Sequence, residues 1–415
     1  MLWLGNGLNL FSPVFLSAQG SVDILWQPSP DTNVIGYNLY YGTSSRGYTN
    51  EISLGNTTSA TISGLVGGVT YYFAATSYDA TGDESDFSNE ISYNIPTSVI
   101  FLSNLHPGSF GGLFYEQDAV RLQSAGGFNL SVTAAGKYSG MLQMSAGKLV
   151  FSGQFGTLCQ ATNSIARKHT NALTVNFSLG SSNQVLGSVS DGQWTANLYG
   201  ERNGFQPTNY GLSPGKYTVM VRGRTLPTSL GNSFGTLTLS SAGLLRFGGT
   251  LADGTKLSQS ASISQYGNWP LFVPLYSGQG LVISWIAFTN TVNTDLGGNL
   301  NWIKPPSAKS LLYQDGLAVQ RPVSGSFYSM GTNSVPTVTT AKLALGGALA
   351  GSPTNQIVSL QFSKANGTFT GQLRDSISGK PVSFQGAFLQ KSSAGYGFVL
   401  GTNLSSPVSL LRSTP

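Results

Sequence analysis

The sequence is poor in charged residues, in histidine and in cysteine. Asp, Glu, Lys and Arg make up only 9% of its 415 residues, against roughly a quarter in an average soluble domain. A single cysteine, Cys159, excludes an internal disulfide framework and a cysteine-based zinc site. The two histidines, His106 and His169, are too few for a His-rich metal site. We therefore expect no metal and no cofactor, and we expect Cys159 to be a small buried or half-buried apolar residue.

Long apolar patterns are also missing. No long segment places apolar residues at i, i+3, i+4 and i+7, so few helices are expected. After residue 20 no apolar stretch reaches the roughly 18–20 residues needed to span a bilayer, so the chain is not expected to span a membrane. Residues 1–20 are apolar and end in a small-x-small pattern, Ala18-Gln19-Gly20, without a basic start. We interpret residues 1–20 as a truncated signal peptide, which predicts a secreted, extracellular or cell-surface protein.

Glycine, small polar residues and scattered aromatics are abundant, with 53 glycines in the chain. This composition is typical of short strands joined by tight turns, and it predicts an all-β protein. Charge is divided unevenly between two regions. Residues 1–107 carry one basic and eight acidic residues, net −7, whereas residues 108–415 carry twenty basic and eight acidic ones, net +12. Separate roles for the two regions, or simply two solvated surfaces, would both give this asymmetry.

The region after residue 20 alternates apolar and polar residues in short runs. "SVDILWQPSP" contains Trp26, and the next run, "YNLYY", places Tyr37, Leu39 and Tyr41 on one face. Leu65 is followed six residues later by Tyr71. In residues 21–95 these positions resemble the strand-B Trp, the Tyr-x-Leu-x-Tyr strand and the tyrosine corner of fibronectin type III domains. The resemblance implies a seven-strand β-sandwich and no chemistry of its own.

The rest of the chain repeats itself. "GKYSGML" at 136–142 and "GTFTGQL" at 367–373 have the same spacing, and a middle version, "GLLRFGGTL", begins at Gly243. Self-similarity at this distance indicates an array of structural units, here antiparallel β-meanders or barrel-like repeats of roughly seven strands each. Gly136, Gly243 and Gly367 are expected at equivalent turns, and Gly140, Gly249 and Gly371 within the strands that follow.

These units resemble uncharacterised repeats of large secreted bacterial surface proteins, in which phrases such as "GTLADGTK" and "WPLFVPLYSG" recur. That resemblance brings no known activity. The predicted organisation is a signal peptide at 1–20, a fibronectin type III domain at 21–97, a linker at 98–107, repeat 1 at 108–200, a linker at 201–214, repeat 2 at 215–304, a linker at 305–324 and repeat 3 at 325–412.

Motifs that carry chemistry are weak. "GNSFG" at 231–235 matches the nucleophile elbow Gly-x-Ser-x-Gly, but a strand-like run follows it and no histidine lies downstream. The acidic residues of the repeats mostly stand beside glycine in turns, so no carboxylate pair is evident. No nucleic-acid-binding signature is present, and the basic residues are scattered along the sequence. We therefore expect a protein that is not an enzyme and does not bind nucleic acid.

The tryptophans are the natural candidates for sugar-binding platforms. Trp194 shares a face with Ala196 and Leu198, which favours a core position, and Trp302 is expected at the matching place in repeat 2. Trp285, in "LVISWIAF", is expected to be buried or at an interface between units. Trp269 lies in the turn-like "YGNWP", and the sequence predicts it as an exposed ligand-binding residue.

Three functions are compatible with this sequence. The first is a secreted or cell-surface, non-catalytic modular protein for adhesion or for binding glycans and other surface components through weak multivalent contacts. The second is a structural spacer in an envelope layer. The third is a non-catalytic accessory part of a polysaccharide-degrading system.

The uneven charge leads to a first prediction. Residues 108–415 should be retained on a sulfated-glycan column and released by salt, because their net charge is positive and exposed charges are screened. Residues 21–97 should pass through. The measurement is the salt concentration at elution of the two fragments. Elution of both fragments together at low salt would contradict the charge argument.

Overall fold

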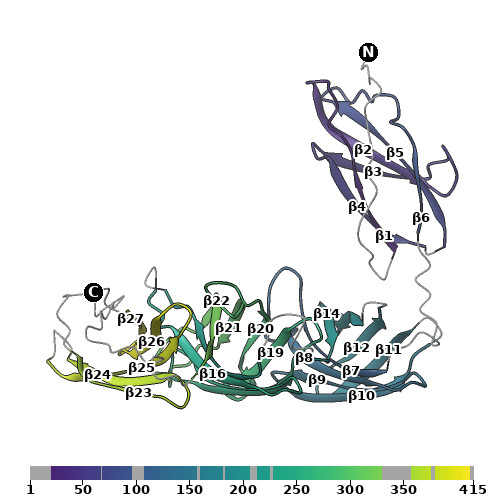
Figure 1. Ribbon diagram of the computed structural model, residues 1–415. Coiled ribbons are helices and arrows are strands. Elements are labelled where there is room, and N and C mark those ends of the chain that lie inside the picture. Colours follow the sequence, from purple (N-terminus) through teal and green to yellow (C-terminus); the bar gives the residue numbers. More distant parts are fainter. Residues whose placement is uncertain are drawn as a thin grey trace. The chain divides into compact units, whose positions relative to one another are not determined.

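The chain folds into two compact units, residues 1–100 and residues 101–415 (Figure 1). The computed structural model describes residues 20–66, 68–95, 107–156, 159–180, 183–205, 213–224, 228–329, 357–374 and 379–411. Within these ranges the secondary structure is β, with one short 3₁₀ turn and no α-helix. The expected all-β fold is confirmed. The predicted signal peptide lies outside the described residues except for Gly20, and so does most of the linker predicted at 98–107.

The first unit contains two antiparallel sheets that share one core. Most residues that carry the fibronectin-like pattern lie in that core, including Trp26, Tyr37 and Leu65, and Tyr41 is partly buried against it. The hydroxyl of Tyr71 accepts a hydrogen bond from the backbone N–H of Val66 at 3.2 Å, which ties the start of one strand to the loop before it. One sheet pairs β1 with β4 and the other has the order β3-β2-β5-β6, so six strands are described where seven were expected. The strands are β1 (Gly20–Leu25), β2 (Val34–Gly42), β3 (Asn50–Gly55), β4 (Ser59–Leu65), β5 (Thr70–Asp79) and β6 (Ile91–Asn94).

The second unit begins with an eight-stranded, nearly closed antiparallel sheet, here called the first barrel. Its strand order is β10-β9-β8-β7-β14-β13-β12-β11, so two four-strand meanders are joined because the last strand pairs with the first. Alternate residues point inward, and Leu173, Val175 and Phe177 of β12 are buried as the period-two pattern predicted. The strands are β7 (Gly108–Tyr115), β8 (Gly126–Val132), β9 (Lys137–Met144), β10 (Gly147–Gln154), β11 (Gln160–Arg167), β12 (Thr170–Leu179), β13 (Gln184–Ser190) and β14 (Thr195–Arg202).

A second barrel follows with the same topology. Its order is β18-β17-β16-β15-β22-β21-β20-β19, again with the last strand paired to the first. Each barrel has eight strands, one more than expected for a repeat. The elements are β15 (Gly215–Val221), β16 (Ser233–Leu239), β17 (Leu244–Thr250), β18 (Lys256–Ser262), β19 (Asn268–Leu275), the 3₁₀ turn η3 (Tyr276–Gly278), β20 (Gly280–Phe288), β21 (Leu296–Lys304) and β22 (Leu317–Tyr328).

The two end strands of the second barrel, β18 and β19, meet without a backbone ladder in the described structure. Pro270 of β19 has no N–H to donate to a neighbouring strand. The side chain of Gln259 on β18 instead bridges the gap between β18 and β19, which is called the seam from here on. It donates to the carbonyl of Pro270 at 3.0 Å and accepts from the indole N–H of Trp269 at 2.8 Å. One amide therefore replaces the ladder and brings the sheet close to closure.

The third sheet is a five-stranded meander in the order β23-β24-β25-β26-β27. It docks on the second barrel, since Phe398 belongs to that barrel's core and the amide of Asn232 donates to the carbonyl of Val408 at 3.1 Å. The "GNSFG" segment therefore has a packing role, and Ser233 opens strand β16 with its hydroxyl accepting from the N–H of Ala252. The strands are β23 (Ile357–Ser363), β24 (Thr368–Arg374), β25 (Pro381–Leu389), β26 (Ala394–Leu400) and β27 (Ser405–Leu411).

The repeated turn glycines have the same backbone conformation in each copy. Gly136, Gly243 and Gly367 all have φ near +76° in the turn before a strand, with values of 76°, 77° and 75°, a region that favours glycine. In copies one and three an aromatic ring of the opposite strand packs over the strand glycine, whereas Gly249 of copy two pairs with Gly235. Gly140 faces Phe151 and Gly371 faces Phe384. The recurring phrase thus encodes a turn and a bend that only glycine permits.

One boundary expectation and one repeat alignment were wrong. Strand β22 begins at Leu317, inside the linker predicted at 305–324, and continues past the predicted start of repeat 3 at 325, where Gly325 pairs with both β21 and β15. The second barrel therefore extends to Tyr328. Trp194 and Trp302 also do not match, since Trp302 lies in the seventh strand of its barrel and Trp194 precedes the eighth strand of the other.

Replacing Gly140 by Val should destabilise the protein by roughly 1–3 kcal/mol, the usual cost of overpacking. A Cβ at this position would lie 2.3 Å from the ring of Phe151. Gly248 is the matched control, since a Cβ there would meet no atom within 4 Å. Urea unfolding would measure both variants, and Phe151→Ala should rescue Gly140→Val. Equal loss of stability in the two glycine variants would contradict the close-approach explanation.

Candidate functional site

The first and second barrels meet through a joint made of both apolar and polar contacts. Leu113 and Ala125 of the first barrel belong to the same buried cluster as Phe272 and Ile283 of the second. Beside this cluster, the carboxylate of Glu201, only 3% exposed, accepts two hydrogen bonds from the amide of Asn268, at 3.1 and 3.0 Å. A buried carboxylate held in this way fixes the orientation of one barrel relative to the other, since its hydrogen bonds are directional.

An aromatic pair extends the joint to the surface. Trp285 on the outer face of β20 lies edge-on to Tyr199 of β14, with 5.6 Å between ring centroids. The hydroxyl of Tyr199 donates to Glu201 at 2.7 Å and accepts from Gln184. Burial, and then the hydrogen bond to Glu201, raise the pKa of Tyr199, so its hydroxyl stays protonated at neutral pH. Trp285 is thereby positioned at the rim of a cavity.

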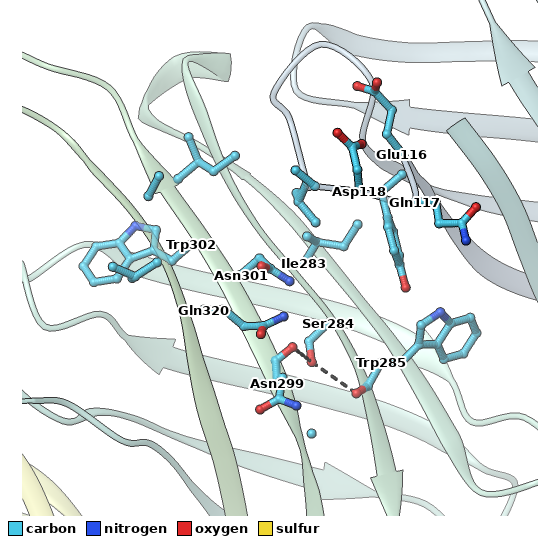
Figure 2. Close-up of a pocket in the computed structure, with 17 residues that line it drawn as sticks. Glu116, Gln117, Asp118, Ile283, Ser284, Trp285, Asn299, Asn301, Trp302 and Gln320 are labelled. Atoms are coloured by element: carbon cyan, nitrogen blue, oxygen red, sulfur yellow. Dashed lines mark hydrogen bonds between the residues drawn. The ribbon is translucent and has the colours of Figure 1, made fainter. Parts of the chain in front are cut away.

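That cavity, the inter-barrel groove, has a volume of about 640 Å³. Its floor is the outer face of β20, β21 and β22, and its wall is the segment that follows β7 (Figure 2). The lining combines two indoles with side-chain amides and hydroxyls, and no lysine or arginine is among the described residues that line it. The polar and aromatic lining residues are Tyr115, Glu116, Gln117, Asp118, Ser284, Trp285, Asn299, Asn301, Trp302 and Gln320.

The floor is shaped by a local opening between β20 and β21. The ladder pairs Ile283 with Asn301 and resumes at Ile286 with Gly298, and the hydroxyl of Ser284 donates to the carbonyl of Asn299 at 2.9 Å in between (Figure 2). Gly298 is required at this point because a Cβ would lie 2.4 Å from the carbonyl oxygen of Trp285.

The floor presents free amides. Asn301 pairs with Gln320 on the adjacent strand, so the two amides lie side by side on the outer face. Within the described part of the chain neither side chain makes a hydrogen bond. Amide groups offer both donors and acceptors, which suits a ligand rich in hydroxyls.

The wall of the groove carries a small negative charge. Arg121 forms ion pairs with Glu116 at 2.9 Å and with Asp118 at 2.6 Å, which leaves one carboxylate in excess. Hydrogen bonds from Arg121 lower the pKa of Asp118 to about 2, so this carboxylate is ionised throughout the physiological range. Asp118 is exposed at the mouth, with 69% of its side chain accessible. A negative mouth disfavours anionic ligands.

A buried polar network supports the floor from inside the second barrel. Lys304 forms an ion pair with Asp253 at 2.7 Å, with side-chain exposures of 8% and 1%. Tyr276 donates to the same carboxylate, and the indole of Trp302 donates to the hydroxyl of Tyr276 at 3.0 Å. Burial alone would raise the pKa of Asp253, but hydrogen bonds from Lys304, Thr255 and Tyr276 outweigh it and lower that pKa. The network anchors β21, whose outer face carries Asn299 and Asn301.

The tryptophan expectations have mixed outcomes. Trp302 is in the core at 2% exposure, as predicted, and Trp285 lies at an interface between units, as predicted. Trp194 is half-buried outside a strand, so its full core placement was wrong. The prediction that Trp269 is exposed was also wrong. Its exposure is 0%, because the turn ends at Gly267 and Trp269 points inward from β19 against Phe247.

Sequence reasoning missed the groove residues. Asn299 and Asn301 alternate with Leu300 and Trp302, a pattern that marks one polar face of a strand. Nothing in that pattern says that the face lines a cavity, because the wall comes from another barrel. Among the acidic residues at 79–86, Asp79 ends strand β5. Asp79 caps its own turn by accepting from Thr81, and no group of acidic, His or Cys side chains in the described ranges could hold a metal ion.

Comparison with known proteins gives only partial likenesses. No protein-family model matches the chain. A Kelch domain-containing protein from Saccharolobus solfataricus is 35% identical over 83 residues, which is 20% of this chain and 10% of that protein. The chain therefore matches about a tenth of that relative's length. The described residues include no helix long and apolar enough to cross a membrane.

Among solved structures, a mutant of the vaccine antigen Transferrin Binding Protein B from Haemophilus parasuis is 8% identical, with 91% of this chain and 94% of that chain covered and a TM-score of 0.20. AofleA from Arthrobotrys oligospora is 9% identical over 83% of this chain and 87% of that one, with a TM-score of 0.15. These TM-scores are too low to establish a shared fold, and no function follows from them.

Because Trp269 is a core residue that also holds the seam, Trp269→Ala should cost about 3–5 kcal/mol in unfolding free energy, the usual range for a large-to-small core change. Trp269→Phe should cost less, since it keeps most of the volume and loses mainly the hydrogen bond to Gln259. Chemical denaturation of both variants would measure this. A stable Trp269→Ala protein would contradict the core assignment.

Proposed function

We propose that this chain is a secreted or cell-surface, non-catalytic modular protein that binds uncharged polysaccharide in the inter-barrel groove. The observation that carries the proposal is the combination of Trp285 with the free amides of Asn301 and Gln320 on one cavity floor. Sugar rings present an apolar face to an indole and hydroxyls to amides, so this combination matches their chemistry. The negative mouth at Asp118 favours neutral sugars over acidic ones.

A non-catalytic role is supported by the arrangement of the carboxylates. Glycoside hydrolysis needs two carboxyl groups on opposite sides of the scissile bond, about 5–10 Å apart. Glu116 and Asp118 stand on the same wall and both pair with Arg121. Asp253 is enclosed in the second barrel with Lys304 and does not line the groove. Binding without turnover is therefore the function that this site supports best.

The first unit is proposed to be a fibronectin type III domain that spaces the binding region from its attachment. Support comes from the buried Trp26 and Tyr37 and from the hydrogen bond between the Tyr71 hydroxyl and Val66. Secretion is proposed from the apolar residues 1–20. An accessory part of a polysaccharide-degrading system is the second candidate, favoured by the same groove. A purely structural spacer would not explain why the amides of Asn301 and Gln320 face the groove without a hydrogen-bond partner among the described residues.

The proposal is tested by glycan-array screening of the full chain, followed by calorimetry on the best neutral oligosaccharide. Gln320→Ala and Asn301→Ala should each weaken binding several-fold, since each removes a hydrogen-bonding group with no described structural partner. Trp285→Ala should weaken it about tenfold. Phe87→Ala removes an aromatic of the first unit that is 52% exposed and serves as the control.

Unchanged affinity in the Gln320 and Asn301 variants would contradict the assignment of the groove as the polysaccharide-binding site. Release of reducing ends from the bound oligosaccharide would contradict the non-catalytic assignment.

A further inference from the structure

Three arginines that are separate in the sequence are neighbours at one edge of the second barrel. Arg222 and Arg224 follow the end of β15, and Arg321 lies in β22, the strand paired with β15. The backbone N–H of Arg222 donates to the carbonyl of Pro322 at 2.9 Å, which continues the pairing beyond the end of β15. The basic residues looked scattered along the chain, but the fold brings these three together.

Backbone carbonyls hold two of the three side chains. The guanidinium of Arg321 donates from Nε to the carbonyl of Arg222 at 2.9 Å and from Nη2 to the carbonyl of Gly223. Arg224 donates from Nε to the carbonyl of Thr228 at 3.1 Å. These carbonyls carry no formal charge, so they orient the guanidinium groups without neutralising them. Arg222 is exposed, while Arg224 and Arg321 are half-buried.

The positive charge of this arginine cluster is not compensated by any described carboxylate. The ion pairs of the described residues involve Arg121, Arg167, Lys304 and Lys391, and none involves Arg222, Arg224 or Arg321. Burial, followed by the charges of Arg224 and Arg222, lowers the pKa of Arg321. Like charges this close together repel one another, and a bound anion would relieve that repulsion.

We propose that Arg222, Arg224 and Arg321 form an anion-binding site for the sulfate or carboxylate groups of an acidic polysaccharide. Guanidinium groups pair with planar carboxylates and with sulfates through two parallel N–H donors. Two of the three side chains are half-buried and oriented by hydrogen bonds, which suits a discrete acidic group. Binding to a lipid surface typically uses flexible, fully exposed basic side chains beside inserted apolar ones. This site differs in sign and location from the inter-barrel groove.

The test compares binding of dextran sulfate and of unmodified dextran to the full chain at low and at high salt. The double variant Arg222→Gln with Arg224→Gln should bind dextran sulfate at least about tenfold more weakly and with a smaller salt dependence. Arg246→Gln is the matched control, because it removes the same charge from an exposed position in β17. It should change the affinity less than twofold.

Several outcomes overturn the proposal. They are equal losses in the double variant and the Arg246 control, tight binding to anionic lipid vesicles without binding to dextran sulfate, and no binding of dextran sulfate at low salt. Thermal unfolding checks that the double variant is folded. If it is not, Arg222→Gln alone replaces it, since no described side-chain hydrogen bond holds Arg222.

The groove variant Gln320→Ala should leave dextran sulfate binding unchanged. Failure of the groove and failure of the arginine cluster are therefore distinguishable. A loss of dextran sulfate binding in Gln320→Ala that matches the loss in the arginine variant would mean that the two sites are one, and would contradict the proposal.

Discussion

The pairing of β22 with both β21 and β15 is the interaction on which most of the second unit depends. It joins the two meanders of the second barrel, because Gly325 lies between Leu296 on one side and Val219 on the other. The floor of the inter-barrel groove ends on the outer face of this strand at Gln320. The arginine cluster forms where the same pairing continues past the end of β15. Without it, neither surface would exist.

The second unit separates its charges by location. No lysine or arginine is among the described residues that line the groove. Beside it, Arg121 forms ion pairs with Glu116 and Asp118, and the other lining residues are uncharged. Unpaired arginines stand elsewhere on the same barrel. Under the two proposals, one chain would present a groove for uncharged sugar rings and a cationic surface for acidic substituents. A polymer that carries both could contact the two surfaces at once, and the two weak contacts would reinforce each other.

Much of the fold could be predicted from local pattern. Alternation identified the strands, and the repeated glycines predicted the turns at Gly136 and Gly367, because only the backbone geometry of the turn is involved. The extent of β22 could not be predicted, because long-range pairing decides it and a Pro-rich segment precedes the strand. Trp269 was misplaced because Gly and Pro around it suggested a turn, whereas the proline is a strand residue at a seam. The groove was missed because its wall and floor come from different barrels.

The seam at Gln259 gives the second barrel a preferred line of opening. The other neighbouring strands of the second barrel are joined by ladders of several hydrogen bonds, but here one side-chain amide provides both described bonds between the two strands. Within the second barrel, a force that pulls the strands apart would separate β18 from β19 before any pair joined by a ladder. Because β19 also carries Asn268 and Phe272 of the joint, such opening would loosen the hold between the barrels. The second barrel would open along this line while its ladders stayed intact.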